Sequence, residues 1–111
     1  MIDGNITMIG PGSLVPEVLR IKHAGYRLVQ ICATKIESGY EITYSFAKEY
    51  EFVCLRMEVK PGTEIVSISN IYEPAFLYEN EIHDLFGIPV TYLSLDYKGN
   101  LYRIEHKTPF Q

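Results

Sequence analysis

The sequence predicts an α+β domain: an antiparallel meander sheet of about four strands, packed by two helices and followed by an extended C-terminal hairpin and tail. Apolar and polar residues alternate along residues 40–47 and 53–60, which is typical of antiparallel strands with one buried face. Apolar residues recur at helical spacing within residues 14–24 and 74–86. Short turn signals separate the predicted strands, so consecutive strands are expected to pair.

The N-terminal part of the chain is predicted to be irregular before the domain begins. We expect residues 1–12 to form an irregular leader and residues 13–111 to form a single α+β domain. Ser13 is a candidate N-cap for a helix over residues 14–24. Gly25 then supplies a C-terminal stop, because glycine readily adopts the left-handed conformation that ends helices.

The predicted sheet follows this helix and is divided by turn signals at residues 37–39, 48–49 and 61–62. Its strands are expected over residues 26–36, 40–47, 53–60 and 65–69. Cys32 and Cys54 fall in the first and third of these strands. A disulfide between them is conceivable if those strands are neighbours, but two buried free thiols are the favoured interpretation.

The second predicted helix lies between Pro74, which suits a first helical position, and Gly87, which ends the pattern. Its packing face is predicted from residues at helical spacing and their neighbours. These residues are Tyr78, Ile82 and Leu85, flanked by Ala75 and Phe86. From Ile88 onward the chain is expected to be extended, with a hairpin turn at residues 98–100.

Composition and charge exclude several classes of function. The formal net charge is −4, which makes nucleic acid an unexpected partner because phosphate backbones require a basic surface. The N-terminal residues do not resemble a targeting segment, since Asp3 stands where a signal peptide carries Lys or Arg. No stretch has the length needed to span a bilayer. A role at a membrane is therefore expected to depend on partner proteins.

Acidic residues are concentrated around the second helix. No Lys or Arg occurs between Lys60 and Lys98, whereas six acidic residues fall there. They are Glu64, Glu73, Glu79, Glu81, Asp84 and Asp96. Such a segment could present an acidic face to a basic partner, pair with the basic C-terminal segment, or simply be a solvated helix face.

A metal or catalytic site is the alternative interpretation of this helix. Glu79 and His83 are spaced i, i+4 with Asp84 adjacent, a pattern that could supply metal ligands or an acid–base pair in a stand-alone metal-dependent enzyme. Such a site needs a further ligand, and the remaining histidines, His23 and His106, are isolated in sequence. An ordinary intrahelical pair is therefore favoured.

The acidic motif on this helix points to a family. Residues 79–81 read Glu-Asn-Glu, and two residues later Asp84 is followed by Leu-Phe-Gly-Ile. This run resembles the signature of the NuoC-type subunit, the thirty-kilodalton subunit of respiratory complex I: Glu-Arg-Glu, two residues, Asp, two large apolar residues, Gly and Ile. Asn80 replaces the Arg, and the long C-terminal extension is missing. Both departures resemble the shorter relatives in Ech-type and CO-linked membrane-bound NiFe hydrogenases.

The resemblance implies a non-catalytic, cofactor-free structural subunit of an energy-converting membrane-bound hydrogenase or NADH dehydrogenase-like complex. It implies docking on the large NiFe-type subunit and the small iron–sulfur subunit, on the cytoplasmic face of the cell membrane. An adaptor for an unrelated partner is a further alternative, and the isolated chain is expected to be able to self-associate. The candidate interface residues are Tyr78, Glu79, Asn80, Glu81, Asp84, Phe86, Gly87 and Arg103.

Overall fold

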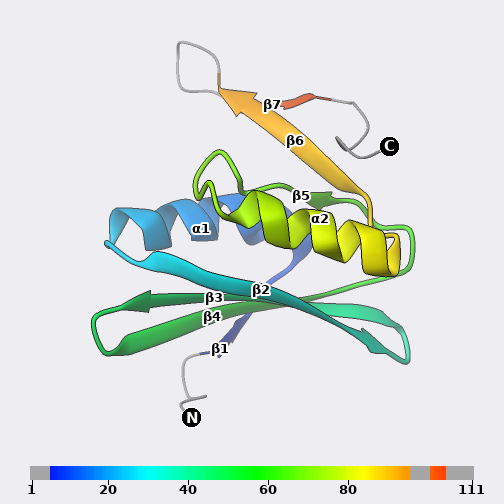
Figure 1. Cartoon of the computed structure of the whole chain (residues 1–111), viewed down its shortest axis with the longest axis horizontal. Helices are drawn as coiled ribbons and strands as arrows, with labels where there is room; N and C mark the ends of the chain where they lie inside the picture. Colours follow the sequence, from blue (N-terminus) through cyan, green and yellow to red (C-terminus); the bar gives the residue numbers. More distant parts are fainter. Residues whose placement is uncertain (1–5, 96–100, 105–111) are drawn as a thin grey trace.

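The computed structural model describes residues 6–95 and 101–104, with side chains described for residues 6–92. Two helices lie along one face of a four-stranded sheet, and two further strands, β6 and β7, lie beyond the helices (Figure 1). The α+β class predicted from the sequence is confirmed. The helices are α1 (Leu14–His23) and α2 (Ala75–Phe86).

The four-stranded sheet has the order β1-β4-β3-β2. β2 (Arg27–Ile36), β3 (Gly39–Lys48) and β4 (Glu51–Val59) form the predicted antiparallel meander. The fourth strand is β1 (Ile6–Met8), which pairs in parallel with β4. The prediction of a wholly irregular leader over residues 1–12 was therefore wrong, because three residues of it complete the open side of β4.

The segment after β4 leaves this sheet. β5 (Ile65–Val66) pairs in parallel with β6 (Val90–Leu95), which pairs antiparallel with β7 (Leu101–Ile104). The predicted fourth meander strand at residues 65–69 is therefore wrong in its partner and length, since the side of β4 that it would need is occupied by β1. The C-terminal hairpin is confirmed by the β6–β7 pairing, while its turn and the tail lie outside the described residues.

Both helices end at glycines, as the sequence predicts. α1 is followed by Gly25 with a φ of +94°, and α2 is followed by Gly87 with a φ of +69°. The amide of Gly87 donates a hydrogen bond to the carbonyl of His83 at 2.8 Å, which satisfies one of the last carbonyls of the helix. α1 begins at Leu14 with Ser13 in the N-cap position, as predicted, but Ser13 also ends a short 3₁₀ turn, η1 (Pro11–Ser13), and makes no side-chain capping bond.

The core lies between the sheet and the helices. The alternation along β3 and β4 places one side chain of every two in this core, as predicted. The buried hydrophobic residues of α1, β3 and β4 are Leu14, Val18, Ile21, Ile42, Tyr44, Phe46, Ala47, Leu55, Met57 and Val59. Cys32 and Cys54 are free thiols, as expected, because β3 separates their strands. The expectation that both are buried was wrong, since Cys32 is exposed and Cys54 is half-buried.

The packing face of α2 differs from the predicted one at one position. Ala75 and Ile82 are buried and Phe86 is half-buried, as expected, but Leu85 is 69% exposed. Glu79 is buried on the arc that also carries Ala75 and Ile82. The helix is rotated because it contacts both β2 and the segment after β5, which moves its buried arc towards Glu79 and leaves Leu85 outside.

Candidate functional site

Glu79 lies at the centre of a buried polar contact. Its side chain is completely buried (0% exposed). One carboxylate oxygen accepts a hydrogen bond of 2.7 Å from the Ser67 hydroxyl, and the other accepts one of 2.8 Å from the Ile68 amide. The carboxylate therefore fastens α2 to the segment that follows β5. The expectation that Glu79 offers its charge to a partner was wrong, because both of its oxygens are engaged inside the domain.

The surroundings of Glu79 change its protonation. Burial raises the pKa of the Glu79 carboxyl to about 7, although the hydrogen bonds from Ser67 and Ile68 act in the opposite direction. Burial and the charge of Glu79 raise the pKa of the Tyr44 hydroxyl, which has no hydrogen-bond partner among the described residues. They also raise the pKa of Tyr92 on β6. Glu79 is therefore a carboxyl that titrates near neutral pH inside the fold.

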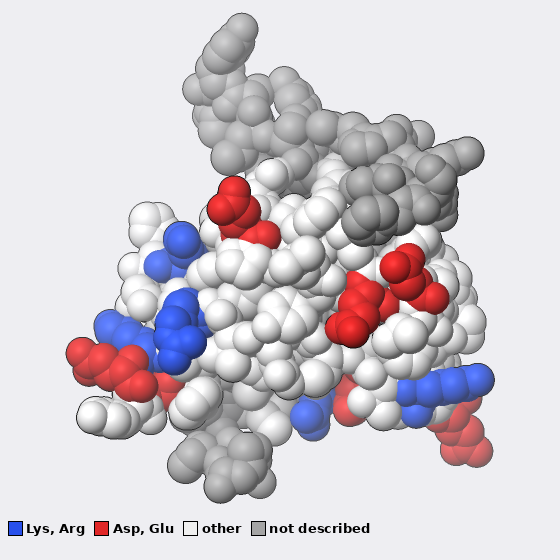
Figure 2. Space-filling view, in the orientation of Figure 1, with Lys and Arg blue, Asp and Glu red and all other residues white. Residues whose placement is uncertain are grey.

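The opposite arc of α2 faces solvent. We call the four exposed residues on this arc, Leu77, Glu81, Asp84 and Leu85, the α2 ridge. Their spacing (i, i+4, i+7, i+8) places them on one side of the helix. Leu77 is 71% exposed, and neither carboxylate makes an ion pair within the described residues. Figure 2 shows acidic side chains over the C-terminal half of α2, with uncharged surface beside them.

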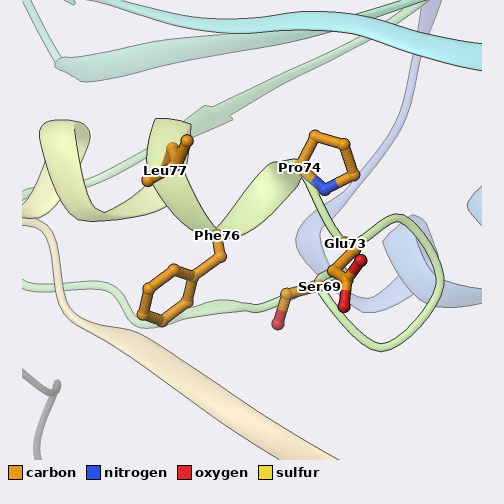
Figure 3. Close-up of a pocket in the computed structure, with 5 residues that line it drawn as sticks. All are labelled: Ser69, Glu73, Pro74, Phe76 and Leu77. Atoms are coloured by element: carbon orange, nitrogen blue, oxygen red, sulfur yellow. The ribbon is translucent and has the colours of Figure 1, made fainter.

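Two hollows adjoin the α2 ridge, one at each end. The first has a volume of about 500 Å³ and lies where the chain enters α2 (Figure 3). Ser69 and Glu73 line it from the loop before the helix, and Phe76 and Leu77 line it from the first turn. The hollow therefore combines an apolar wall with one carboxylate, which suits an aliphatic side chain that carries a positive charge.

The second hollow is a groove of about 230 Å³ between α2 and β2. It is lined by Ile31, Cys32, Ala33, Glu81, Ile82, Leu85 and Phe86. Glu81 is the only charged residue in this lining. The α2 ridge is thus bordered at both ends by apolar hollows that each contain one carboxylate.

The other predicted interface residues have different environments. The Tyr78 hydroxyl donates a hydrogen bond of 3.0 Å to the carbonyl of Val29 in β2, and the Phe86 ring packs at 5.5 Å from that of Tyr40. Arg103 lies in β7 opposite Leu93, and its side chain is outside the described part. Tyr78 and Phe86 therefore position α2 on the sheet.

The alternative metal site does not assemble. Glu79 is buried, Asp84 is exposed, and the Nδ1 atom of His83 lies 3.2 Å from the carbonyl oxygen of Ile88. Within residues 6–95 and 101–104, no group of three His, Cys, Asp or Glu side chains is placed to hold a metal ion. The three residues share a helix without sharing a site.

A protein-family match covers both helices, the strands from β2 to β5 and most of β6, and begins just after β1. The family model described as "Respiratory-chain NADH dehydrogenase, 30 Kd subunit" matches residues 9–94. The chain belongs to this family. It is 27% identical over 94 residues to a subunit of the NADH-quinone oxidoreductase of Phenylobacterium zucineum (strain HLK1). That match covers 77% of the chain and 44% of the relative, so the chain spans less than half the length of this curated relative.

The fold of this member of the 30 kDa-subunit family is also similar to a solved structure. It matches a chain in the structure of the membrane-bound sulfane sulfur reductase, described as an archaeal respiratory membrane complex, with a TM-score of 0.67 and 18% identity. The match covers 81% of this chain and 59% of the other. No helix in the described part of the chain is long and apolar enough to cross a membrane.

Asn80 is the position at which this family member departs from the Glu-Arg-Glu signature. Its side chain is only 6% exposed, and neither its amide nitrogen nor its carbonyl oxygen has a hydrogen-bond partner among the described residues. Asparagine carries no charge, so an ion pair from this position is not available to this chain. Asn80 was predicted to lie at an interface, and in the described fold it is instead covered.

Sequence reasoning missed the contact between Ser67 and Glu79, although a signal for it existed. Glu79 lies three residues before Ile82 and four after Ala75, so it shares their arc of the helix. A carboxylate on a buried arc requires donors, because an unpaired buried charge is very costly. Ser67 and Ser69, whose hydroxyls lie in the segment before the helix, were among the candidate donors.

Proposed function

We propose that this chain is a non-catalytic, cofactor-free structural subunit of a membrane-bound complex I-like respiratory complex, docked to its partners through the α2 ridge. Membership of the 30 kDa-subunit family supports the class of complex. The observation that carries the docking site is the α2 ridge itself, where two exposed leucines enclose two unpaired carboxylates. Exposed apolar side chains gathered in this way are typical of surfaces that a partner covers.

The α2 ridge has the chemistry of a mixed interface. Burial against a partner of Leu77, and likewise of Leu85, would contribute about 1.5–3 kcal/mol to the binding free energy, the usual value for a large aliphatic side chain. Glu81 and Asp84 would accept charge-assisted hydrogen bonds from Arg or Lys of the partner. The contacts that Glu79 and Tyr78 make with the rest of the fold hold α2 in place, so little entropy is lost by ordering it on binding.

The finer proposal is that the complex is an energy-converting hydrogenase, with this chain at the large NiFe-type and small iron–sulfur subunits on the cytoplasmic side. The resemblance of the Asn80 variant of the motif to short hydrogenase relatives supports it. The solved chain with a similar fold belongs to a sulfane sulfur reductase, so the hydrogenase assignment needs a direct test of the metal content and activity of the complex. We expect stoichiometric nickel and hydrogen evolution in the complex purified through this chain, and a nickel-free complex would contradict the hydrogenase assignment.

The docking site is tested by recovering that complex with variants of the α2 ridge. We expect Glu81→Ala/Asp84→Ala to reduce the recovered partner subunits at least roughly tenfold, with unchanged thermal unfolding, because both side chains are exposed. Glu37→Ala/Glu58→Ala removes two exposed carboxylates outside α2 and is the matched control. Undiminished recovery with the ridge variant would remove the α2 ridge from the interface.

A further inference from the structure

One edge of the four-stranded sheet is open along β2. β2 pairs with β3 on one side, and no described strand pairs with its other side. The β2–β3 register shifts between Leu28 and Gln30 and is regular from residue 30 to residue 36. In a regular edge strand every second residue directs its N–H and C=O away from the sheet, so roughly three or four residues of this stretch offer free backbone groups.

The open part of β2 borders the groove between β2 and α2. Ile31 and Ala33 face this groove from the strand, and Ile82 and Leu85 face it from the helix. These side chains give the groove an apolar lining, and Glu81 adds a carboxylate that makes no ion pair within the described residues. The unpaired backbone of β2 therefore lies beside an apolar groove that contains the carboxylate of Glu81.

The start of β2 is closed by contrast. The Tyr78 hydroxyl bonds to the Val29 carbonyl, and the Tyr72 hydroxyl donates to the carbonyl of Tyr26 just before the strand at 2.6 Å. The bulge at residues 28–30 also interrupts regular pairing there. The opposite edge of the sheet, β1, is only three residues long. Among the described residues, the regular stretch of β2 is thus the longest run of unpaired backbone along an edge of this sheet.

We propose that a partner subunit extends this sheet by adding a strand along residues 30–36 of β2. This inference rests on the proposed function and names the partner element: an extended segment with alternating apolar residues and an Arg or Lys opposite Glu81. Backbone hydrogen bonds to β2 hold the added strand, and its apolar side chains enter the groove. The basic residue is required because Glu81 is the one charge in the groove lining.

Amide hydrogen exchange distinguishes an added strand from contact through the α2 ridge alone. The chain is compared free and in the complex purified from its native host, at single-residue resolution. We expect alternate amides within residues 30–36 to exchange at least about tenfold more slowly in the complex, while those of β1 exchange unchanged. Unchanged exchange of β2 in an intact complex would overturn this inference and leave the proposed function standing. Recovery of the chain without partners would overturn both.

A pair of proline variants tests the same point by mutation. Adjacent residues of a strand direct their N–H groups to opposite sides, so Thr34→Pro and Lys35→Pro remove one N–H on the β3 side and one on the open side. The side chains of Thr34 and Lys35 are both exposed, so the two variants differ mainly in which backbone N–H they remove. The variant that removes the N–H on the open side should fold normally, but at least about tenfold less complex should be recovered with it. Normal recovery with that variant would refute strand addition.

Discussion

Replacing Glu79 with glutamine should make the stability of this chain less dependent on pH. Glu79→Gln keeps the size of the side chain and removes its titration. In the native chain burial raises the pKa of this carboxyl to about 7, against an ordinary value of 4.5. The folded state therefore binds a proton more tightly than the unfolded state. The stabilisation from that proton is complete below about pH 4.5 and is lost as the pH rises through 7.

The size of the effect follows from the two pKa values of the Glu79 carboxyl. Each unit of difference is worth about 1.36 kcal/mol. The interval between 4.5 and about 7 therefore corresponds to roughly 3 kcal/mol of unfolding free energy. Relative to the native chain, Glu79→Gln should gain about this amount between acidic and mildly alkaline pH. Other carboxyls titrate alike in both proteins and cancel in the difference.

Urea unfolding of both purified proteins from about pH 4.5 to about pH 8.5 measures this difference. Glu81→Gln makes the same change of carboxylate to amide at an exposed position of the same helix and is the matched control. A difference for Glu79→Gln that varies by less than about 0.5 kcal/mol over the range would refute the assignment of a buried, neutral-titrating carboxyl.

Two further substitutions probe the same fold. Ser67→Ala removes the 2.7 Å bond to Glu79 and should cost about 1.5–3 kcal/mol at mildly alkaline pH and less at acidic pH, where the carboxyl is protonated; equal losses at both would contradict a bond to the charged form. Gly39→Ala would place a Cβ 2.1 Å from the Val59 carbonyl oxygen at a φ of +151°, and should cost at least about 2 kcal/mol in thermal unfolding; Gly10→Ala, which has open space, should be nearly neutral.

The meander was predictable because its signals are local. Alternation along β3 and β4 decides which side chains are buried, and short turns decide that consecutive strands pair. The same local signals do not specify which strand completes the sheet. β1 has three residues and β5 has two, and their partners are far away in sequence. The error in the predicted topology was therefore to place the segment at residues 65–69 beside β4, where the structure has β1.

The candidate site was predictable in position and only partly in composition. The acidic motif identified α2, and the structure leaves Glu81 and Asp84 exposed as a docking surface requires. The interface role of these residues remains a prediction. Glu79 and Asn80 were misplaced because a motif does not state which of its residues face inward. That depends on the rotation of α2, which its contacts with β2 and with the segment after β5 determine together.

The hydroxyls of Tyr72 and Tyr78, which bond to the beginning of β2, affect how the domain opens. They connect that end of the strand to α2 and to the loop before it, through carbonyls of Tyr26 and Val29. The far end, at residues 34–36, has no such attachment among the described hydrogen bonds outside the sheet. Fluctuations of β2 should therefore begin beside the turn to β3 and stop at Val29. Residues 34–36 can then separate from the rest of the domain while α2 stays packed on the sheet.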